Sequence, residues 1–363
     1  MRVLVAPQEL KGTLAAEEAA DAIAAGIARA RPSWEIDRLP MSDGGPGFLD
    51  ALRRAIRNDT HAEAVHDAMG RPVLGRYLTL RGRATAVVEA AQANGLMHVT
   101  AGERDAMRAD TFGVGELLAA AMRLRPATLL VGVGGSATTD GGAGMARALG
   151  ARLLDRHGAA IATGGGGLTA LDRIEWKRPE AFEGADIVVA TDVVNSLTGP
   201  NGAAHVFGPQ KGATPEECVA LDAALTRFAA IVRRDLGVDI ERVPGAGAAG
   251  GLAGGLIAFL GARVASGFDV VAEAVNLRER LREADIVITG EGSFDSQSLQ
   301  GKVTGRLLEV AREAGKPCVV FAGRAPGGGA RMLDEVEPDR ARRMREAAGA
   351  LERLAARWAG EQP

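Results

Sequence analysis

One glycine-rich stretch, residues 128–145, constrains the fold more than any other part of the sequence. An apolar, β-branched run (128–133) stops abruptly at glycine, and a short polar segment leads into an alanine-rich run that favours a helix. This order predicts a buried strand, a tight loop and the start of a helix. Such a loop presents backbone N–H groups and a helix N-terminus, which suit an anion such as phosphate. We therefore expect a phosphate site here, with Asp140 as a ligand for Mg²⁺ or for a substrate hydroxyl.

The same order of strand, loop and helix recurs towards both ends of the chain. Apolar runs at residues 2–6, 36–39 and 286–288 each end in a loop that precedes a helical pattern. This alternation is typical of a parallel sheet, in which ligands bind beyond the carboxyl ends of the strands. Residues 61–91 differ, because their short alternating segments indicate an antiparallel meander. We therefore predict an α/β fold with a domain boundary near residue 60.

Composition limits the classes of function. A net charge of −3 and an aromatic content of 4% argue against a nucleic-acid-binding protein. The two cysteines, Cys218 and Cys318, have no metal-binding spacing and indicate a reducing compartment. The chain lacks an apolar run near the ~20 residues of a membrane span, and its first apolar run is too short for a signal peptide. We expect a soluble cytoplasmic protein that binds neither membrane nor nucleic acid.

The glycine loop allows two other interpretations. Residues 132–137 satisfy the dinucleotide pattern G-x-G-x-x-A, and Asp155 lies about 20 residues further on, where an acid that binds the ribose would stand. A nicotinamide-dependent oxidoreductase is therefore an alternative, although it leaves residues 140–142 unexplained inside what should be a helix. In the other interpretation, the glycines only permit close packing. The P-loop pattern G-x-x-x-x-G-K-[ST] is absent, so any ATP is bound in another way.

Acids and lysines gather at the predicted strand ends and glycine turns. The acids are Asp43, Asp140, Asp192, Glu291 and Asp295, and the lysines are Lys11, Lys211 and Lys302. Taken singly, each acid is more simply a turn residue and each lysine a solvated surface residue. As a set, they match phosphoryl transfer, which needs carboxylates for Mg²⁺, one carboxylate for the attacking hydroxyl and cations for the developing charge.

The sequence resembles the bacterial type I glycerate kinase family nearly from end to end. The resemblance rests on several separate motifs, which are residues 6–14, SDGG at 42–45, GGSATTDGGAG at 134–144, 192–195, FGPQKG at 207–212, PGAGAAGG at 244–251 and 289–302. It implies ATP- and Mg²⁺-dependent phosphorylation of D-glycerate, with 2-phosphoglycerate favoured over 3-phosphoglycerate as the product.

The resemblance also implies a domain organisation. Two α/β domains are expected, one with a parallel sheet of the Rossmann or flavodoxin type and one with a mixed sheet, with a cleft between them. Residues 1–60 and 285–363 would form a discontinuous domain, and residues 61–284 an inserted domain that carries the loop 132–145. A homodimer remains open.

Roles for individual residues follow from the same resemblance. The ATP phosphates would meet Gly134, Gly135, Ser136, Ala137 and Thr138, with Lys211 or Lys302 as a clamp. Glycerate would meet Lys11, Asp43, Gly44 and Gly45. Asp192, Glu291 and Asp295 are candidate Mg²⁺ ligands. The catalytic candidates are Asp192, Asp295 and Lys11, with Asp192 preferred over Asp295 as the base.

Three departures from the family pattern motivate another hypothesis. The family motif Ala-Pro-Asp-Ser-Phe-Lys has Gln8 in place of its aspartate, and Asp-Gly-Gly-Glu-Gly-Thr has Pro46 in place of its glutamate. After residues 321–323 the chain is also expected to lack a stretch with another strand. These departures favour an alternative in which the fold is kept but the kinase is degenerate or acts on another small hydroxy acid.

Overall fold

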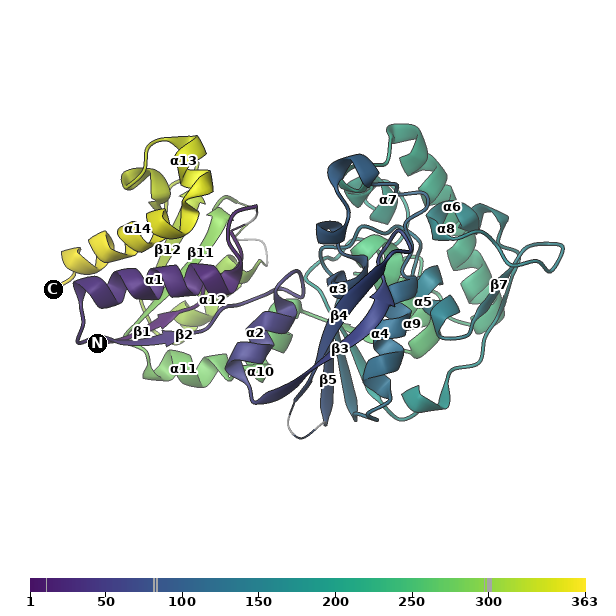
Figure 1. The fold of residues 1–363 in the computed structure, drawn as a ribbon, viewed down its shortest axis with the longest axis horizontal. Helices are drawn as coiled ribbons and strands as arrows, with labels where there is room; N and C mark the ends of the chain where they lie inside the picture. Colours follow the sequence, from purple (N-terminus) through teal and green to yellow (C-terminus); the bar gives the residue numbers. More distant parts are fainter. Residues whose placement is uncertain (11, 81, 83, 297, 299–301) are drawn as a thin grey trace. The chain divides into compact units, whose positions relative to one another are not determined.

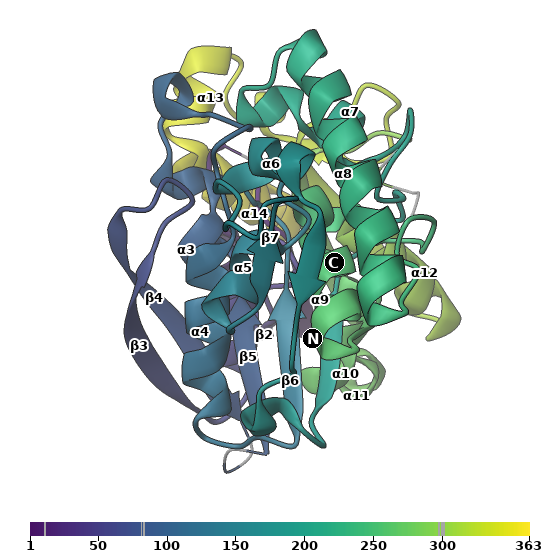
Figure 2. The same cartoon turned by 90° about the vertical axis from the view of Figure 1, so that its right-hand side faces the viewer.

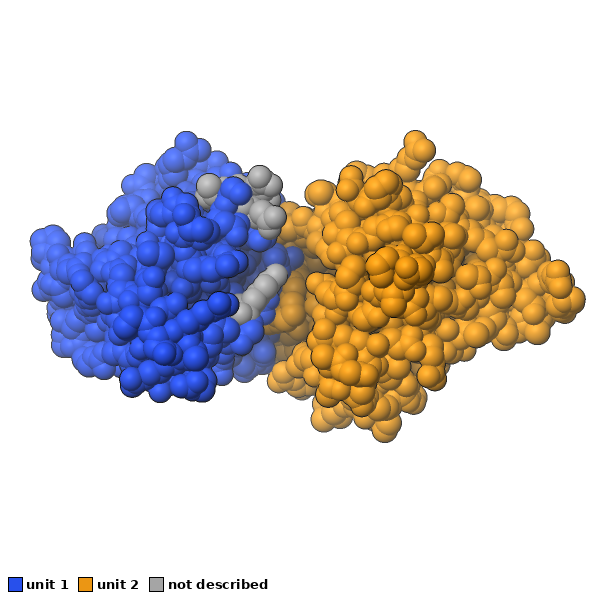
Figure 3. All heavy atoms as spheres, turned by 90° about the horizontal axis from the view of Figure 1, so that it is seen from above, with its two compact units in different colours: residues 1–43, 50–56, 268–363 blue, residues 44–49, 57–267 orange. Residues whose placement is uncertain are grey.

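The computed structural model describes residues 1–10, 12–80, 82, 84–296, 298 and 302–363. The predicted site residue Lys11 lies outside these described residues. Two compact units make up the chain (Figure 3). Unit 1 contains Met1–Asp43, Asp50–Ile56 and Phe268–Pro363, and unit 2 contains Gly44–Leu49 and Arg57–Gly267.

Unit 1 is built on a five-stranded parallel sheet in the order β13-β12-β11-β1-β2. The strands are β1 (Arg2–Val5), β2 (Glu35–Arg38), β11 (Ile286–Ser293), β12 (Cys318–Arg324) and β13 (Arg331–Met332). Val3 pairs with Ile286 on one side and with Ile36 on the other, so segments from both ends of the chain share this sheet. Because the strands are parallel, their carboxyl ends meet at one edge, which collects the loops after β1, β2, β11 and β12.

Helices cover both faces of the unit 1 sheet (Figure 1). Val3 and Val5 point to one face, where they join a core with Ile23 of α1 (Ala16–Ala30) and Leu354 of α14 (Ala347–Glu361). The other helices of this unit are α11 (Leu277–Glu283), α12 (Val303–Glu313) and α13 (Arg340–Arg345). Helices α11 and α12 contact the strands and lie on the opposite side of the sheet from α1 and α14.

Unit 2 is built on a mixed six-stranded sheet in the order β10-β9-β6-β5-β4-β3. Its strands are β3 (Asn58–His66), β4 (Pro72–Leu80), β5 (Thr85–Glu89), β6 (Thr128–Gly132), β9 (Asp186–Ala190) and β10 (Arg263–Ala265). Strands β5, β6, β9 and β10 are parallel, whereas β4 is antiparallel to both β3 and β5. One parallel and one mixed α/β sheet were expected, and the predicted fold class is confirmed.

The helices of unit 2 enclose one large apolar core (Figure 2). They are α3 (Ala91–Asn94), α4 (Phe112–Met122), α5 (Ala143–Ala148), α6 (Gly164–Gly167), α7 (Ala203–Phe207), α8 (Pro215–Leu236) and α9 (Leu252–Leu260), with a small hairpin of β7 (Arg152–Leu154) and β8 (Arg173–Glu175). The division between the units falls within the sequence of two further helices, α2 (Phe48–Ala55) and α10 (Gly267–Ala274). The longest, α8, starts with a capping box in which Thr214 and Glu217 satisfy each other's backbone N–H groups.

Candidate active site

The glycine loop of unit 2 connects β6, which ends at Gly132, to α5, which begins at Ala143. Asp140 lies at its centre and is fully buried. Its carboxylate accepts hydrogen bonds from Thr111 N (2.9 Å), Thr111 Oγ1 (2.8 Å), Gly142 N (3.1 Å) and Gly144 N (2.9 Å). Oδ2 accepts three of these hydrogen bonds and Oδ1 accepts one, so the structure gives Asp140 a role inside the loop in place of the expected role as a ligand for Mg²⁺ or for a substrate hydroxyl. The residue instead fixes the loop at the entrance to α5.

The side chain of Lys211 is buried beneath the glycine loop and does not reach into solvent as a phosphate clamp would. Its side chain is buried, and Nζ donates hydrogen bonds to Ser136 Oγ (3.2 Å) and to Thr138 O (2.5 Å). Burial lowers the pKa of Lys211 to about 7, and the negative charge of Asp140 opposes that shift. Lys211 therefore braces the loop from within and places a cation directly beneath it.

Asn94 holds the loop from the other side. Its backbone carbonyl accepts a hydrogen bond from Ala137 N (2.7 Å), and its side chain donates to Thr138 Oγ1 (3.0 Å). Ser136, Ala137 and Thr138 are buried, whereas Gly134 and Gly135 are half-buried. Ala137 N and Thr138 Oγ1 are both engaged in the internal support of the turn, and direct contact of these residues with phosphate stays a prediction. The accessible part of the predicted phosphate loop is its glycine end.

The segment Gly44–Leu49 lies against that glycine end. Gly44 O accepts a hydrogen bond from Gly134 N (3.0 Å), so this amide of the predicted phosphate site is also engaged. Gly44 has φ +87°, and a Cβ there would fall 2.2 Å from Ala190 O at the end of β9. Pro46 lies against Gly135, where a Cβ would fall 2.7 Å from Pro46 Cγ. The family departure at Pro46 is thus a packing residue next to the loop.

Glu89 was not identified from the sequence but organises the same corner. It ends β5, is buried, and accepts hydrogen bonds from Leu49 N (2.9 Å) and Gly47 N (3.4 Å). These amides open helix α2, where a carboxylate is favourable because the first N–H groups of a helix lack internal partners. The sequence did offer one signal for Glu89, an acid at the end of a predicted strand. Its hydrogen-bond partner Leu49, however, lies 40 residues away in the sequence.

Asp192 lies where the sequence predicted, just beyond the carboxyl end of β9. The residue is half-buried, and Oδ1 accepts a hydrogen bond from Gly267 N (2.9 Å) at the start of α10. Strands β6 and β9 are parallel neighbours, with Gly132 paired to Ala190. The carboxylate of Asp192 and the glycine loop therefore occupy the same edge of the unit 2 sheet.

Unit 1 contains a pocket of about 540 Å³ at the carboxyl edge of its sheet. Four residues selected from the sequence line it together, Asp43, Glu291, Asp295 and Lys302. Gln8, the family departure in the first loop, lines the same pocket, and its Nε2 donates to Glu291 Oε2 (3.2 Å). The structure thus brings together acids and a lysine that are far apart in the sequence.

Glu291 is the most unusual group in this pocket. It is buried, and its Oε1 has no hydrogen-bond partner among the described residues. Burial raises the pKa of Glu291, and the nearby hydroxyls of Ser298 and Thr304, followed by the positive charge of Lys302, oppose that shift. A buried carboxylate oxygen without a partner is costly unless a ligand completes it. Glu291 is therefore suited to bind a proton, a cation or a donor group of a substrate.

Three arginines of this pocket were missed by sequence reasoning, Arg324 at the end of β12 and Arg340 and Arg343 on α13. Arg340 and Arg343 stand in no glycine loop, whereas Arg324 follows Gly323 at the end of an apolar run and precedes a triple glycine at 327–329, a local signal that was not used. They become visible only when the fold places α13 beside the carboxyl ends of β11 and β12.

The sequence profile of the glycerate kinase family matches residues 3–360. The chain belongs to this family. It is 40% identical to the Escherichia coli (strain K12) glycerate 2-kinase over 324 residues, which cover 89% of this chain and 85% of that protein. It is also 40% identical to the Bacillus subtilis (strain 168) glycerate kinase over 324 residues, which cover 89% of this chain and 85% of that protein. The crystal structure of a Salmonella typhimurium LT2 protein, assigned as a glycerate kinase 2, superposes with a TM-score of 0.83 at 38% identity, and the match covers 99% of this chain and 97% of that one.

Membership of the glycerate kinase family confirms the resemblance and the prediction that the protein is a kinase. The alternative as a nicotinamide-dependent oxidoreductase is wrong. Helix α5 begins only after the hydrogen-bonded carboxylate of Asp140 and not directly behind the G-x-G-x-x-A pattern. Asp155, the expected ribose ligand, instead accepts hydrogen bonds from His157 N and Ala159 N within its own turn.

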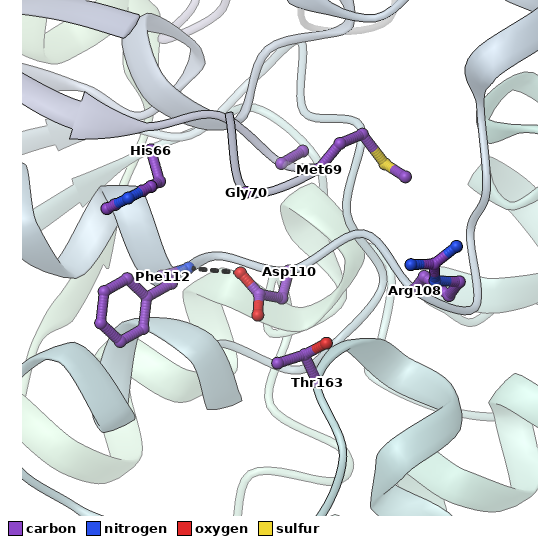
Figure 4. Close-up of a pocket in the computed structure, with 8 residues that line it drawn as sticks. His66, Met69, Gly70, Arg108, Asp110, Phe112 and Thr163 are labelled. Carbon is purple, nitrogen blue, oxygen red and sulfur yellow. Dashed lines mark hydrogen bonds between the residues drawn. The ribbon is translucent and has the colours of Figure 1, made fainter. Parts of the chain in front are cut away.

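A second pocket, of about 240 Å³, lies in unit 2 beside the first turn of α4 (Figure 4). Asp110 lines it and accepts a hydrogen bond from Phe112 N (2.9 Å). Burial and the nearby charge of Asp140 raise the pKa of Asp110 to about 6, against the opposing effect of the Phe112 N–H group. None of the residues selected from the sequence lines this pocket.

Two searches of the described residues bear on metals and membranes. No group of three or more His, Cys, Asp or Glu side chains within the described part of the chain is arranged to hold a metal ion. None of the helices that the structure describes combines the length and the apolarity required to cross a bilayer.

Proposed function

We propose that this protein phosphorylates D-glycerate with ATP in the presence of Mg²⁺ and releases 2-phosphoglycerate and ADP. The observation that carries the proposal is the family match over residues 3–360, together with named glycerate kinases that share 40% identity over most of their length. The preference for the 2-hydroxyl rests on the E. coli relative, whose name specifies a 2-kinase.

Unit 2 would supply the half that binds the nucleotide. The glycine end of its loop is half-buried at Gly134 and Gly135, with Gly134 N bonded to Gly44 O, and the amine of Lys211 lies beneath the turn against Ser136 and Thr138. A buried cation without a carboxylate in hydrogen-bond contact favours an anion above it, because the anion offsets the cost of burying the charge. Lys211 would then act through the loop and not by direct contact with phosphate.

Unit 1 would supply the half that binds the acid. Its pocket of about 540 Å³ is lined by both acidic and basic side chains, which suits a small polyhydroxy acid better than an apolar ligand. Asp43 and Gln8 would face the hydroxyl groups. Gly44 and Gly45, the other residues expected to contact glycerate, belong to unit 2 and would offer backbone groups to the substrate.

Asp192 would act as the general base. Its carboxylate would take the proton of the attacking hydroxyl as that oxygen bonds to the γ-phosphorus and the bond to the β-phosphate oxygen breaks, releasing ADP. Asp192 suits this role because it stands at the same sheet edge as the glycine loop. Asp295 would then serve unit 1 as a ligand of Mg²⁺.

Mg²⁺ fits the acids of unit 1. It is usually held by one or two carboxylates together with substrate phosphates, so it does not need a ready-made cluster of three side chains. Glu291, with its buried and unpartnered Oε1, and Asp295 would hold it. When bound, the ion would neutralise charge on the transferred phosphoryl group.

Gln8 supports the alternative of altered specificity. In the family motif an aspartate stands at this position, whereas here the amide of Gln8 donates to Glu291. The exchange removes one negative charge from the pocket, which would alter the preference among hydroxy acid substrates while the fold is kept.

The deciding experiment is ³¹P NMR of the products formed from D-glycerate, ATP and Mg²⁺. A phosphomonoester resonance that matches authentic 2-phosphoglycerate, with equimolar ADP, supports the proposal. A resonance of 3-phosphoglycerate overturns the regiochemistry alone. Absence of turnover with D-glycerate, but turnover with another hydroxy acid from a panel, supports altered specificity.

A further inference from the structure

The unit 1 pocket contains an arginine that is oriented by one neighbour and has its remaining donors open. Arg324 ends β12, and Ser293 is its direct partner on β11 in the parallel register. Arg324 Nε donates a hydrogen bond to Ser293 Oγ (2.9 Å). This contact uses the inner edge of the guanidinium and fixes the direction of its plane.

The outer edge of the same guanidinium is available. Within the described part of the chain, the two terminal nitrogens of Arg324 have no hydrogen-bond or ion-pair partner, and the side chain lines the pocket. Most arginines of unit 1 differ in this respect. Arg331, for example, is paired with Glu335 and Glu361. A planar fork with two parallel N–H donors matches a carboxylate, which it can bind through both oxygens.

Charge is distributed unevenly across the pocket. Arg340 and Arg343 on α13 join Arg324 in lining it, and Arg343 Nη1 is anchored to the carbonyl oxygens of Glu337 (2.8 Å) and Pro338 (3.1 Å). Asp43 follows β2, at the opposite edge of the sheet order β13-β12-β11-β1-β2. Strands β12 and β2 are three spacings apart, or about 14 Å. The acids Glu291 and Asp295 line the pocket as well, and Ser293 Oγ also donates to Asp295 Oδ2 (3.4 Å). The three arginines of β12 and α13 therefore form the basic side of a pocket whose acidic groups follow β2 and lie on and after β11.

We propose that Arg324, held in position by Ser293, binds the carboxylate of the substrate and makes the enzyme specific for small hydroxy acids over uncharged polyols. This inference rests on the proposed function and adds the residue that recognises the acid. Arg340 and Arg343 contribute positive charge around that contact, whereas Ser293 is a positioning residue that acts only through Arg324.

The test compares four variants with the wild type by steady-state kinetics and by calorimetric titration with D-glycerate. Arg324→Gln keeps a polar side chain but removes the charge and the fork, and Arg324→Lys keeps only the charge. Ser293→Ala removes the support. Arg345→Gln is the matched control, because Arg345 is exposed on α13 and does not line the pocket.

The expected signature is a split between the two substrates. Arg324→Gln raises KM and Kd for D-glycerate by about 10- to 100-fold, the loss expected for hydrogen bonds to a charged group, while KM for ATP stays within about twofold. Arg324→Lys recovers part of this loss, Ser293→Ala has a smaller effect in the same direction, and Arg345→Gln has none. An unchanged Kd for D-glycerate in Arg324→Gln overturns the inference. A rise in KM for ATP alone also overturns it, because Arg324 would then contact a phosphate group of ATP and not the carboxylate of the acid.

The titration separates this inference from the proposed function. Wild-type protein that binds D-glycerate but does not phosphorylate it would overturn the function, and Arg324 would still be tested by the change in Kd. Turnover of D-glycerate that is insensitive to Arg324→Gln would overturn the inference alone. Wild-type protein that neither binds nor phosphorylates D-glycerate would overturn both.

Discussion

Lys211 Nζ donates a hydrogen bond to the carbonyl oxygen of Thr138 over 2.5 Å, so a buried lysine supports the turn between β6 and α5. Asp140 is the acid that interacts with this lysine through space, but it spends its oxygens on Thr111, Gly142 and Gly144. The loop is therefore held by a buried lysine and a buried carboxylate, which form hydrogen bonds with backbone and hydroxyl groups around the loop and not with each other.

The first prediction concerns the pH dependence of stability. Burial lowers the pKa of Lys211 from 10.5 to about 7, so between these values the unfolded chain binds a proton that the folded protein does not. Stability from this group therefore rises with pH across that window, by up to about 1.4 kcal/mol per pH unit. Urea unfolding at pH 7, 8 and 9 should show the wild type gaining stability relative to Lys211→Met. A constant difference between the two proteins would show that Lys211 is not the titrating group.

The outcome for Lys211 illustrates what the sequence could and could not predict. Periodicity and glycine turns predicted the fold class and located Asp192 just beyond a strand end, because these are local properties. The strand expected at 286–288 continues to Ser293, so Glu291 lies within β11 and not in the loop after it. Burial of a polar side chain is not local. Lys211 meets Ser136 from 75 residues away, and Asp140 meets Thr111 from 29 residues away. Both were interpreted as ligand-binding residues because their types suited the chemistry, whereas their partners depend on tertiary packing. Arg324 was missed although it follows Gly323 at the end of an apolar run, since its partner Ser293 is found only when β11 and β12 are paired.

The second prediction tests the structural role of Asp140. In Asp140→Asn an amide nitrogen replaces one acceptor and faces N–H donors, so at least one buried donor loses its partner. We expect a loss of about 2–4 kcal/mol in stability, because an unsatisfied buried polar group costs ~1–3 kcal/mol and a charged acceptor is also removed. Hydrogen exchange of amides 134–144 localises the effect to unit 2. Asp334→Asn, at an exposed position, is the control and should change stability by less than about 0.5 kcal/mol. Equal exchange rates in the wild type and Asp140→Asn would contradict the assignment.

The third prediction uses two glycines of the segment Gly44–Leu49, which lies against the glycine loop. Gly44 and Gly47 have nearly equal φ angles, +87° and +86°, so alanine is strained to a similar extent at both. Their surroundings differ, because a Cβ at Gly44 would fall 2.2 Å from Ala190 O, whereas a Cβ at Gly47 meets nothing within 4 Å. Gly47→Ala should cost about 1 kcal/mol from backbone strain, and Gly44→Ala about 3 kcal/mol or more, since the end of β9 must also move. Urea midpoints measured side by side give the comparison. If Gly44→Ala were no worse than Gly47→Ala, this segment would not pack against β9 as described.

The last prediction concerns the base. Asp192 stands beyond the carboxyl end of β9 and is held by Gly267 N, and Asp186 begins the same strand, where it pairs with Arg263. Asn at position 192 keeps the shape and the hydrogen bond from Gly267 but cannot accept the proton of the attacking hydroxyl. Asp192→Asn should therefore lower kcat for D-glycerate by about 10²-fold or more, with KM for ATP little changed. Asp186→Asn is the matched control, because it alters an acid on the same strand at the end remote from the loop, and its kcat should equal that of the wild type. A kcat of Asp192→Asn within about threefold of wild type would contradict this assignment. The base would then be Asp295, since the sequence offered only these two acids for the proton transfer, and Asp295→Asn should show the loss in kcat.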